Sequence, residues 1–407
     1  MTKAELAQKA LEEGEGIFRL TPTWVPRSFC RPGKRIKLHP DDYYIFGLKR
    51  GGVDERWFSS TTHAENGPGT PEDEGLSYIV VDRNGKEKVL LRDAVSSLRE
   101  KVIGEHLWNK YGRWPMFSKF FDNQGPLPLH IHHRDEHAKR VHQAGKPEMY
   151  FFPSQLNNHG GEFPFTFFGL NPETTREQVK QSLENFPKGD NNLLNLSRAY
   201  KIDLDTGWDV PPGVLHAPAS LCTYEPQFAS DVYAMYQSVL YGGQCVPEEL
   251  LWKDCPPEEK GNFDYLVDVI DWKLNVDPDF HKNRFMPPIP ASDLKEMESN
   301  GYKEEWICYK SDKVCAKRLT VLPGRTVTVK DSAAYGIICL QGHGRFGKWN
   351  LETPALIHYG QLTNDEFFVT EKAAEKGVTV VNESDCDSIV ILKHFAENPD
   401  LKLTKEK

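Results

Sequence analysis

The sequence lacks the long apolar segment that a membrane-spanning helix requires. Its apolar runs are short, such as Tyr78 to Val81 and Ile389 to Leu392, whereas about 20 residues are needed to cross a bilayer. Residues 2–11 form an amphipathic segment without the basic head and apolar middle of a signal peptide. We therefore expect a cytoplasmic protein with no membrane partner.

Paired cysteine motifs and basic clusters are also missing. The 8 cysteines include no CxxC pair and no regular spacing, which favours reduced thiols over a disulfide framework or a zinc knuckle. The formal net charge is −9 and the basic residues are dispersed, so the field of the molecule would repel a polyanion. Nucleic acid is therefore not an expected partner, although a local basic pocket for one phosphate is compatible with this charge.

The chain has 407 residues, more than a single core usually supports, so we expect two packed units. Segments rich in β-branched and aromatic residues, punctuated by Gly, Pro, Asn and Asp, dominate residues 77–92, 127–168, 200–243 and 305–395. Helical periodicity is clear in only a few places, including residues 3–13, 93–108, 174–186 and 263–274. Many short strands with few long helices predict barrels or sandwiches.

A proline-rich passage at residues 286–290 interrupts this pattern, because proline can neither donate to a sheet ladder nor continue a helix. We place a boundary there. It separates a unit with helical additions (residues 1–285) from an all-β unit (residues 286–407).

Four residues form the pattern that predicts chemistry. His130 and His132 lie two apart in an alternating segment, so both side chains point to one face of a strand. Glu148 opens an aromatic strand after a turn, and His216 follows a Pro-x-Gly turn. Three imidazoles and one carboxylate suit one divalent cation, with Zn, Mn, Fe and Ni as candidates.

The order His-x-His, Glu, then Pro-x-Gly-x-x-His matches the two-part signature of the cupin barrel. The stretches that carry a closer resemblance are residues 115–122, 127–132, 135–142 and 145–149. They resemble the core of the type I phosphomannose isomerase (mannose-6-phosphate isomerase) family of the cupin superfamily, and the similarity extends over residues 50–245.

The resemblance implies a mainly β protein with two cupin (RmlC-like jelly-roll) barrels and a few peripheral helices. It also implies that the metal ligands are His130, where the family usually has Gln, with His132, Glu148 and His216. Zn is then the most expected metal, and we expect no other cofactor. The C-terminal unit contains His343 and His358 but no comparable series, so we expect a metal-free barrel there.

Departures from the family pattern concern the substrate. The family's active-site arginine is missing from Val232 to Met235, its lysine is replaced by Asp135 and its proline by His133. A dianionic phosphate requires charge-assisted donors, so these losses make an unphosphorylated sugar plausible. Three basic residues could compensate: Arg134, Arg140 and Lys146.

The resemblance implies a metal-dependent aldose–ketose isomerase acting on a sugar or sugar phosphate. Such a reaction needs a Lewis acid and a group that moves a proton between C1 and C2. The candidates for this group are Lys146, His133 and Asp231, although His133 would face away from the ligands on a regular strand.

Two alternatives stay open. His130 in place of Gln gives a three-His, one-Glu ligand set that is common in iron-dependent cupin dioxygenases. A non-catalytic sugar-binding cupin would keep the metal and dispense with the arginine. The sequence does not determine the exact sugar, the native metal or the oligomeric state.

Overall fold

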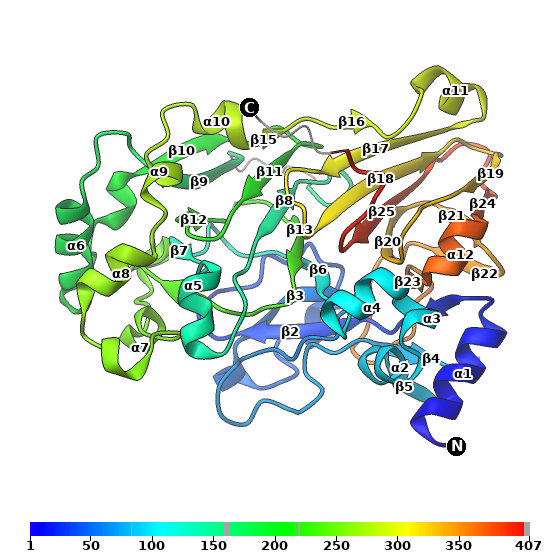
Figure 1. The fold of residues 1–407 in the computed structure, drawn as a ribbon, viewed down its shortest axis with the longest axis horizontal. Coiled ribbons are helices and arrows are strands. Elements are labelled where there is room, and N and C mark those ends of the chain that lie inside the picture. Colours follow the sequence, from blue (N-terminus) through cyan, green and yellow to red (C-terminus); the bar gives the residue numbers. More distant parts are fainter. Residues whose placement is uncertain (83, 158–162, 219, 403–407) are drawn as a thin grey trace.

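The computed structural model describes residues 1–402 except residues 83, 158–162 and 219. Two groups of sheets lie side by side, one formed by strands from residues 23–286 and one mostly by strands from the C-terminal part, with helices at the periphery (Figure 1). The described residues include no helix that is both long and apolar enough to span a membrane.

The first group consists of two sheets that share a core. The larger has the order β15-β11-β8-β13-β6-β3-β2 and the smaller the order β10-β9-β12-β7-β14. Phe168 of the smaller sheet stacks on Trp208 of the larger at a ring-centroid distance of 5.0 Å. The strands of the larger sheet are β2 (Thr23–Arg27), β3 (Gly52–Phe58), β6 (Met116–Phe121), β8 (Glu148–Phe151), β11 (Gly207–Val210), β13 (Thr223–Phe228) and β15 (Phe285–Met286). Those of the smaller sheet are β7 (His130–Ile131), β9 (Phe165–Leu170), β10 (Ser197–Lys201), β12 (His216–Ala217) and β14 (Ala234–Met235).

The second group is also a pair of sheets around one core. The orders are β1-β23-β20-β25-β18-β17-β16 and β19-β24-β21-β22. The strands of the first are β1 (Ile17–Arg19), β16 (Ile289–Pro290), β17 (Tyr302–Cys308), β18 (Cys315–Val321), β20 (Tyr335–Gln341), β23 (Glu366–Val369) and β25 (Ile389–Phe395). Those of the second are β19 (Thr326–Val329), β21 (His343–Phe346), β22 (Trp349–Glu352) and β24 (Val378–Asn382). Side chains from both sheets, such as Val380 and Phe367, meet in the same buried cluster.

The strand β15 belongs to the first group and β16 to the second, so the chain passes from one group of sheets to the other within the proline-rich passage. The strand β1 departs from the sequence order, because Ile17–Arg19 pairs with β23 in the second group. The division into units at residue 286 stays a prediction. The expectation of a mainly β fold with peripheral helices is confirmed.

Two of the predicted helices are interrupted. Residues 93–108 form parts of α2 (Leu91–Leu98), α3 (Glu100–Ile103) and α4 (Glu105–Tyr111), because Arg99 and Gly104 adopt φ values of 54° and 83°. Residues 263–274 form α8 (Phe263–Val269) and α9 (Trp272–Asn275), and Asp271 caps the second. The other helices are α1 (Lys3–Glu13), α5 (Asp135–Ala138), α6 (Arg176–Glu184), α7 (Glu248–Leu251), α10 (Phe280–Arg284), α11 (Leu294–Ser299) and α12 (Glu371–Lys376).

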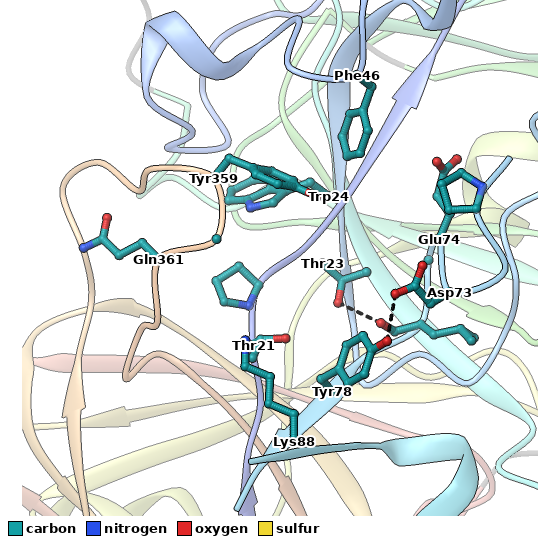
Figure 2. A pocket seen from close by; sticks show the side chains of 15 residues that line it. Thr21, Thr23, Trp24, Phe46, Asp73, Glu74, Tyr78, Lys88, Tyr359 and Gln361 are labelled. Carbon is teal, nitrogen blue, oxygen red and sulfur yellow. Dashed lines mark hydrogen bonds between the residues drawn. The ribbon is translucent and has the colours of Figure 1, made fainter. Parts of the chain in front are cut away.

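A cavity of about 200 Å³ lies beside β2, between residues 71–78 and residues 359–361 (Figure 2). Trp24, Phe46 and Tyr359 give it aromatic walls, and Asp73 accepts a hydrogen bond from Tyr78 at 2.7 Å. The cavity therefore lies between a strand of the first group and a turn of the second.

A buried ion pair also connects the two groups of sheets. Arg56 of β3 donates two hydrogen bonds to Asp365, at 2.8 and 3.0 Å, and one to Glu366 of β23 at 3.4 Å. All three side chains are at most 2% exposed. Burial raises the pKa of Glu366 to about 8, although Arg56 opposes this shift.

We expect Arg56→Ala to lower the free energy of unfolding by about 3–5 kcal/mol, because it leaves Asp365 and Glu366 buried without their cation. Urea unfolding measures the change. The control is Arg345→Ala, since the pair of Arg345 with Glu383 is about half exposed and should contribute about 0–1 kcal/mol. Equal, small losses in both variants would contradict this role for Arg56.

Candidate metal centre

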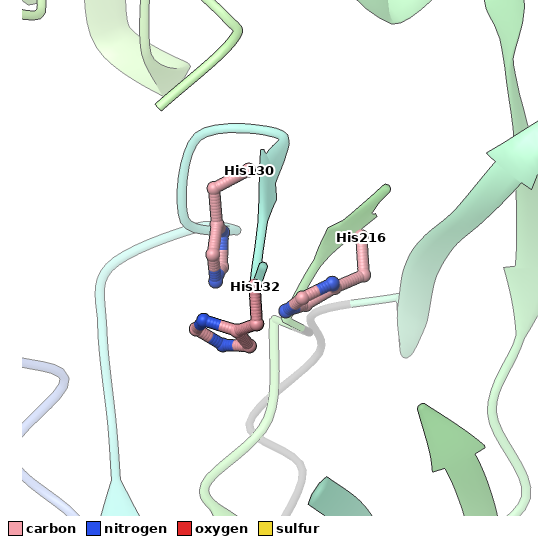
Figure 3. Close-up of side chains that lie close together, drawn as sticks. All are labelled: His130, His132 and His216. Atoms are coloured by element: carbon pink, nitrogen blue, oxygen red, sulfur yellow. The ribbon is translucent and has the colours of Figure 1, made fainter. Parts of the chain in front are cut away.

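Three predicted ligands converge from two neighbouring strands. His130 lies on β7, His132 follows directly, and His216 begins β12, where it pairs opposite His130. The ring centroids lie 4.1 Å apart for His130 and His216 and 5.2 Å apart for His130 and His132. One nitrogen from each ring lies within 4.8 Å of the others, and the rings gather around one point (Figure 3).

The backbone fixes the orientation of these rings. Each Nδ1 lies 2.8 Å from a carbonyl oxygen: His130 from Pro128, His132 from Val232, and His216 from Val214. A carbonyl oxygen only accepts hydrogen bonds, so each Nδ1 carries the hydrogen and each Nε2 keeps its lone pair. Metal-binding histidines are commonly held by such a bond.

Glu148 approaches the histidines from the facing sheet. Its Oε2 lies 2.9 Å from His132 Nε2, and its Oε1 lies 3.1 Å from His216 Nε2. Tyr150 donates a hydrogen bond to Oε1 at 2.7 Å. Burial opposes ionisation of Glu148, but His132 and Lys146 outweigh burial and hold the pKa of Glu148 well below its ordinary value.

The donor atoms fit a divalent cation. Burial lowers the pKa of His130 well below its ordinary value and that of His132 to about 4, so both rings are neutral near pH 7. His216 Nε2 is buried without a hydrogen-bond partner and lies 3.1 Å from Glu148 Oε1. Because neutral Nε2 and carboxylate oxygens both carry lone pairs, a cation between them would satisfy both. His130, His132, Glu148 and His216 could therefore hold the metal.

A small cavity of about 30 Å³ adjoins this centre. It is lined by Arg27, Phe29, Glu55, Lys119, Leu127, His130, His132, Lys146, Pro218, Glu225, Asp231, Tyr233 and Met235. A volume of this size accommodates about one water molecule, so a larger ligand requires some lining side chains to move.

Charges of alternating sign line the cavity. Arg27 donates to both oxygens of Glu55 at 3.2 Å and lies 3.5 Å from Asp231. Lys119 lies 3.2 Å from Glu225, and Lys146 lies 3.7 Å from the same carboxylate.

Two carboxyl groups of this cavity, those of Glu225 and Asp231, differ in their protonation. Burial and the neighbouring Glu148 raise the pKa of Glu225 to about 8. Burial opposes ionisation of Asp231 as well, but Arg27 outweighs it and lowers the pKa of Asp231 well below its ordinary value. Asp231 therefore stays ionised, whereas Glu225 can carry a proton near neutral pH.

Lysine 146 lies between the predicted ligands and this series of charges. Its Nζ is 3.1 Å from both His132 Nε2 and Glu148 Oε2, and it lines the cavity together with Asp231. Of the two residues predicted as catalytic, Lys146 thus contacts His132 and Glu148, and Asp231 lines the same cavity as His130 and His132.

His133 is not among the residues that line this cavity. Successive side chains of an extended segment point to opposite faces, which accounts for the position of His133 outside the cavity. Burial lowers the pKa of its ring to about 3. Arg134 and Arg140 also do not line the cavity, since they bind the Asp268 carbonyl and the Glu258 and Glu259 carboxylates, respectively.

Sequence reasoning missed four charged residues of the cavity: Arg27, Glu55, Lys119 and Glu225. Lys119 and Glu225 carried a usable signal, since each is a charged residue within a run of buried residues, on β6 and β13. Buried charges require partners, so their pairing could have been anticipated.

The chain matches no protein-family model and no curated protein. Among solved structures, it is similar to mannose 6-phosphate isomerase from Bacillus subtilis, with a TM-score of 0.60 and 14% identity over 93% of this chain and 100% of that chain. A mutant phosphomannose isomerase from Salmonella typhimurium gives a TM-score of 0.63 and 13% identity, over 94% of this chain and 100% of that one. The likeness shows that the chain has the fold of these isomerases.

We expect His132→Ala and His216→Ala each to lose one equivalent of tightly bound divalent cation, because each removes a lone pair that points at the centre. Elemental analysis of the purified proteins measures this loss. His133→Leu is the matched control and should retain the metal, since its ring does not line the cavity. Unchanged metal content in both alanine variants would exclude a metal at this centre.

Proposed function

We propose that the protein is a metal-dependent aldose–ketose isomerase that acts on a sugar. The observation that carries this proposal is the convergence of His130, His132, Glu148 and His216 beside a buried lysine and a second carboxylate. The fold likeness to isomerases named for mannose 6-phosphate supports the same class of reaction.

The reaction moves a proton between C1 and C2 while negative charge develops on a sugar oxygen. A divalent cation on the four ligands would supply a Lewis acid for that oxygen. The ammonium group of Lys119 adds hydrogen-bond donors in a buried site, where such donors stabilise developing charge more strongly than in water.

Lys146 is the residue that we propose for proton transfer. Its Nζ lies 3.1 Å from the predicted ligand Glu148 and 3.7 Å from Glu225, and its side chain is 3% exposed. Lys146 would act as a neutral amine whose former proton is held by Glu225. The amine would take the proton from one sugar carbon and return it to the other. Asp231 would instead keep Arg27 in place through their ion pair.

The charges of the cavity favour an unphosphorylated sugar. Each lining cation already has a carboxylate nearby: Arg27 has Glu55 at 3.2 Å, Lys119 has Glu225 at 3.2 Å, and Lys146 has Glu148 at 3.1 Å. A phosphate dianion would compete with these carboxylates, whereas neutral hydroxyl groups can donate to them and accept from the cations.

We expect the metal-loaded protein to convert mannose to its ketose faster than mannose 6-phosphate. Lys146→Met should lower kcat by about 10²–10⁴-fold, the usual contribution of a proton-transfer group, with a smaller change in KM. Lys372→Met, at an exposed position of α12, is the control. Ketose formation is measured on wild type and both variants.

The absence of turnover on mannose, mannose 6-phosphate and lyxose in metal-loaded protein would defeat the isomerase proposal. Tight sugar binding without turnover would then indicate the sugar-binding alternative. Equal losses of kcat in Lys146→Met and Lys372→Met would remove Lys146 from the mechanism while leaving the reaction class intact.

The second candidate function is an iron-dependent dioxygenase. The specific observation that favours it is that three imidazoles, rather than two, meet at the centre. Oxygen uptake by the Fe(II)-loaded protein in the presence of a small organic substrate would distinguish it, because isomerisation consumes no oxygen.

A further inference from the structure

A second group of metal-ligating side chains lies at the surface, between two segments that are distant in sequence. It consists of His39, Asp42 and His358, with one donor atom of each within 4.8 Å of the others. His39 and His358 stack at a centroid distance of 3.9 Å with an interplanar angle of 24°. None of the three lines the cavity beside the first centre.

The backbone holds these two segments together independently of the side chains. Leu38 and Ile357 form a parallel β-bridge. His39 N–H donates to the Ile357 carbonyl at 2.8 Å, and Ile357 N–H donates to the Lys37 carbonyl at 2.8 Å. The three donor side chains are therefore positioned by the fold before any ligand binds, which lowers the entropic cost of binding.

The distances suit a small divalent cation. His358 Nδ1 lies 3.0 Å from Asp42 Oδ2, close to the separation of neighbouring ligands around a metal with bonds of about 2.0–2.2 Å. Tyr359 N–H donates to the same carboxylate at 2.9 Å. This bond lowers the pKa of Asp42, so the carboxylate is ionised at neutral pH.

The exposure of the group leaves room to complete the coordination shell. His358 is 62% exposed, whereas Asp42 is 16% and His39 is 27% exposed. Two imidazoles and one carboxylate form a ligand set typical of zinc, and water can occupy the remaining positions.

We propose that His39, Asp42 and His358 form a second divalent-cation site that binds zinc. The bound cation would link the segment at residues 37–42 to the turn at residues 357–361. The proposal differs from the expectation of a metal-free C-terminal barrel, because His358 belongs to that unit. Tyr359 follows His358 directly and forms a wall of the cavity beside Trp24 (Figure 2), so the cation would also fix that wall.

Zinc titration of chelator-treated protein, followed by calorimetry, tests the proposal. In the His132→Ala background, which lacks a ligand of the first centre, zinc should still bind with one equivalent. Adding His358→Ala should weaken this binding at least tenfold, since even outer-shell changes cost about 10–100-fold. The matched control is His343→Ala, at an exposed position of β21 in the same unit, and it should leave zinc binding unchanged.

A thermal scan of the same proteins provides a second measurement. Zinc should raise the unfolding temperature of His132→Ala, because a ligand that binds only the folded state stabilises it, and the increase should disappear with His358→Ala or His39→Ala. If His132→Ala neither binds zinc nor gains stability from it, the proposal is wrong and the three side chains form only a hydrogen-bonded latch. The first centre is tested by comparing the metal content of His132→Ala with that of wild type. The second site is tested within the His132→Ala background, so failure of one site can be told from failure of the other.

Discussion

Removal of charged groups from water is the constraint on which the first pair of sheets depends. Arg27, Lys119 and Lys146 are nearly inaccessible, and isolated buried charges cost several kcal/mol each even after relaxation. The chain resolves this cost by alternation, since each cation lies between carboxylates from neighbouring strands. The positions of β2, β3, β6, β8 and β13 in one sheet are therefore linked to the electrostatics of the cavity.

The second pair of sheets meets the same constraint differently. Lys317 and Lys393 contact Glu304 and Asp331, with distances of 2.7 Å for Lys317 to Asp331 and Lys393 to Glu304. Two cations and two carboxylates satisfy one another there. In the first pair of sheets, the neutral imidazoles of His130 and His132 bring lone pairs without positive charge beside Glu148, and Lys146 lies 3.1 Å from the same carboxylate. A divalent cation held there would satisfy the lone pairs of the imidazoles, whereas the described ion pairs of the second interior leave no such lone pairs to satisfy.

Sequence patterns predicted the parts of the site that depend on local geometry. The alternation at residues 127–133 predicted that His130 and His132 lie on one side of a strand. In the structure they do, and His216, which follows the Pro-x-Gly turn, lies beside them. The same alternation directs His133 away from the cavity. The mainly β class followed from composition and turn residues, but the helix breaks at Arg99 and Gly104 depend on positive φ angles that periodicity does not reveal.

The pairing of Arg27 with Asp231 could not be predicted, because 204 residues separate them and only the sheet order makes them neighbours. This pairing also bears on the substrate. The guanidinium of Arg27 already donates to both oxygens of Glu55. It can bind a phosphate only if Glu55 gives up these bonds, which would leave a buried carboxylate without its cation and is unfavourable. Sugar hydroxyl groups impose no such exchange, because each can accept from a cation and donate to its carboxylate at the same time. The buried ion pairs therefore support the proposal of an unphosphorylated sugar, on grounds that come from the charges of the cavity rather than from the metal.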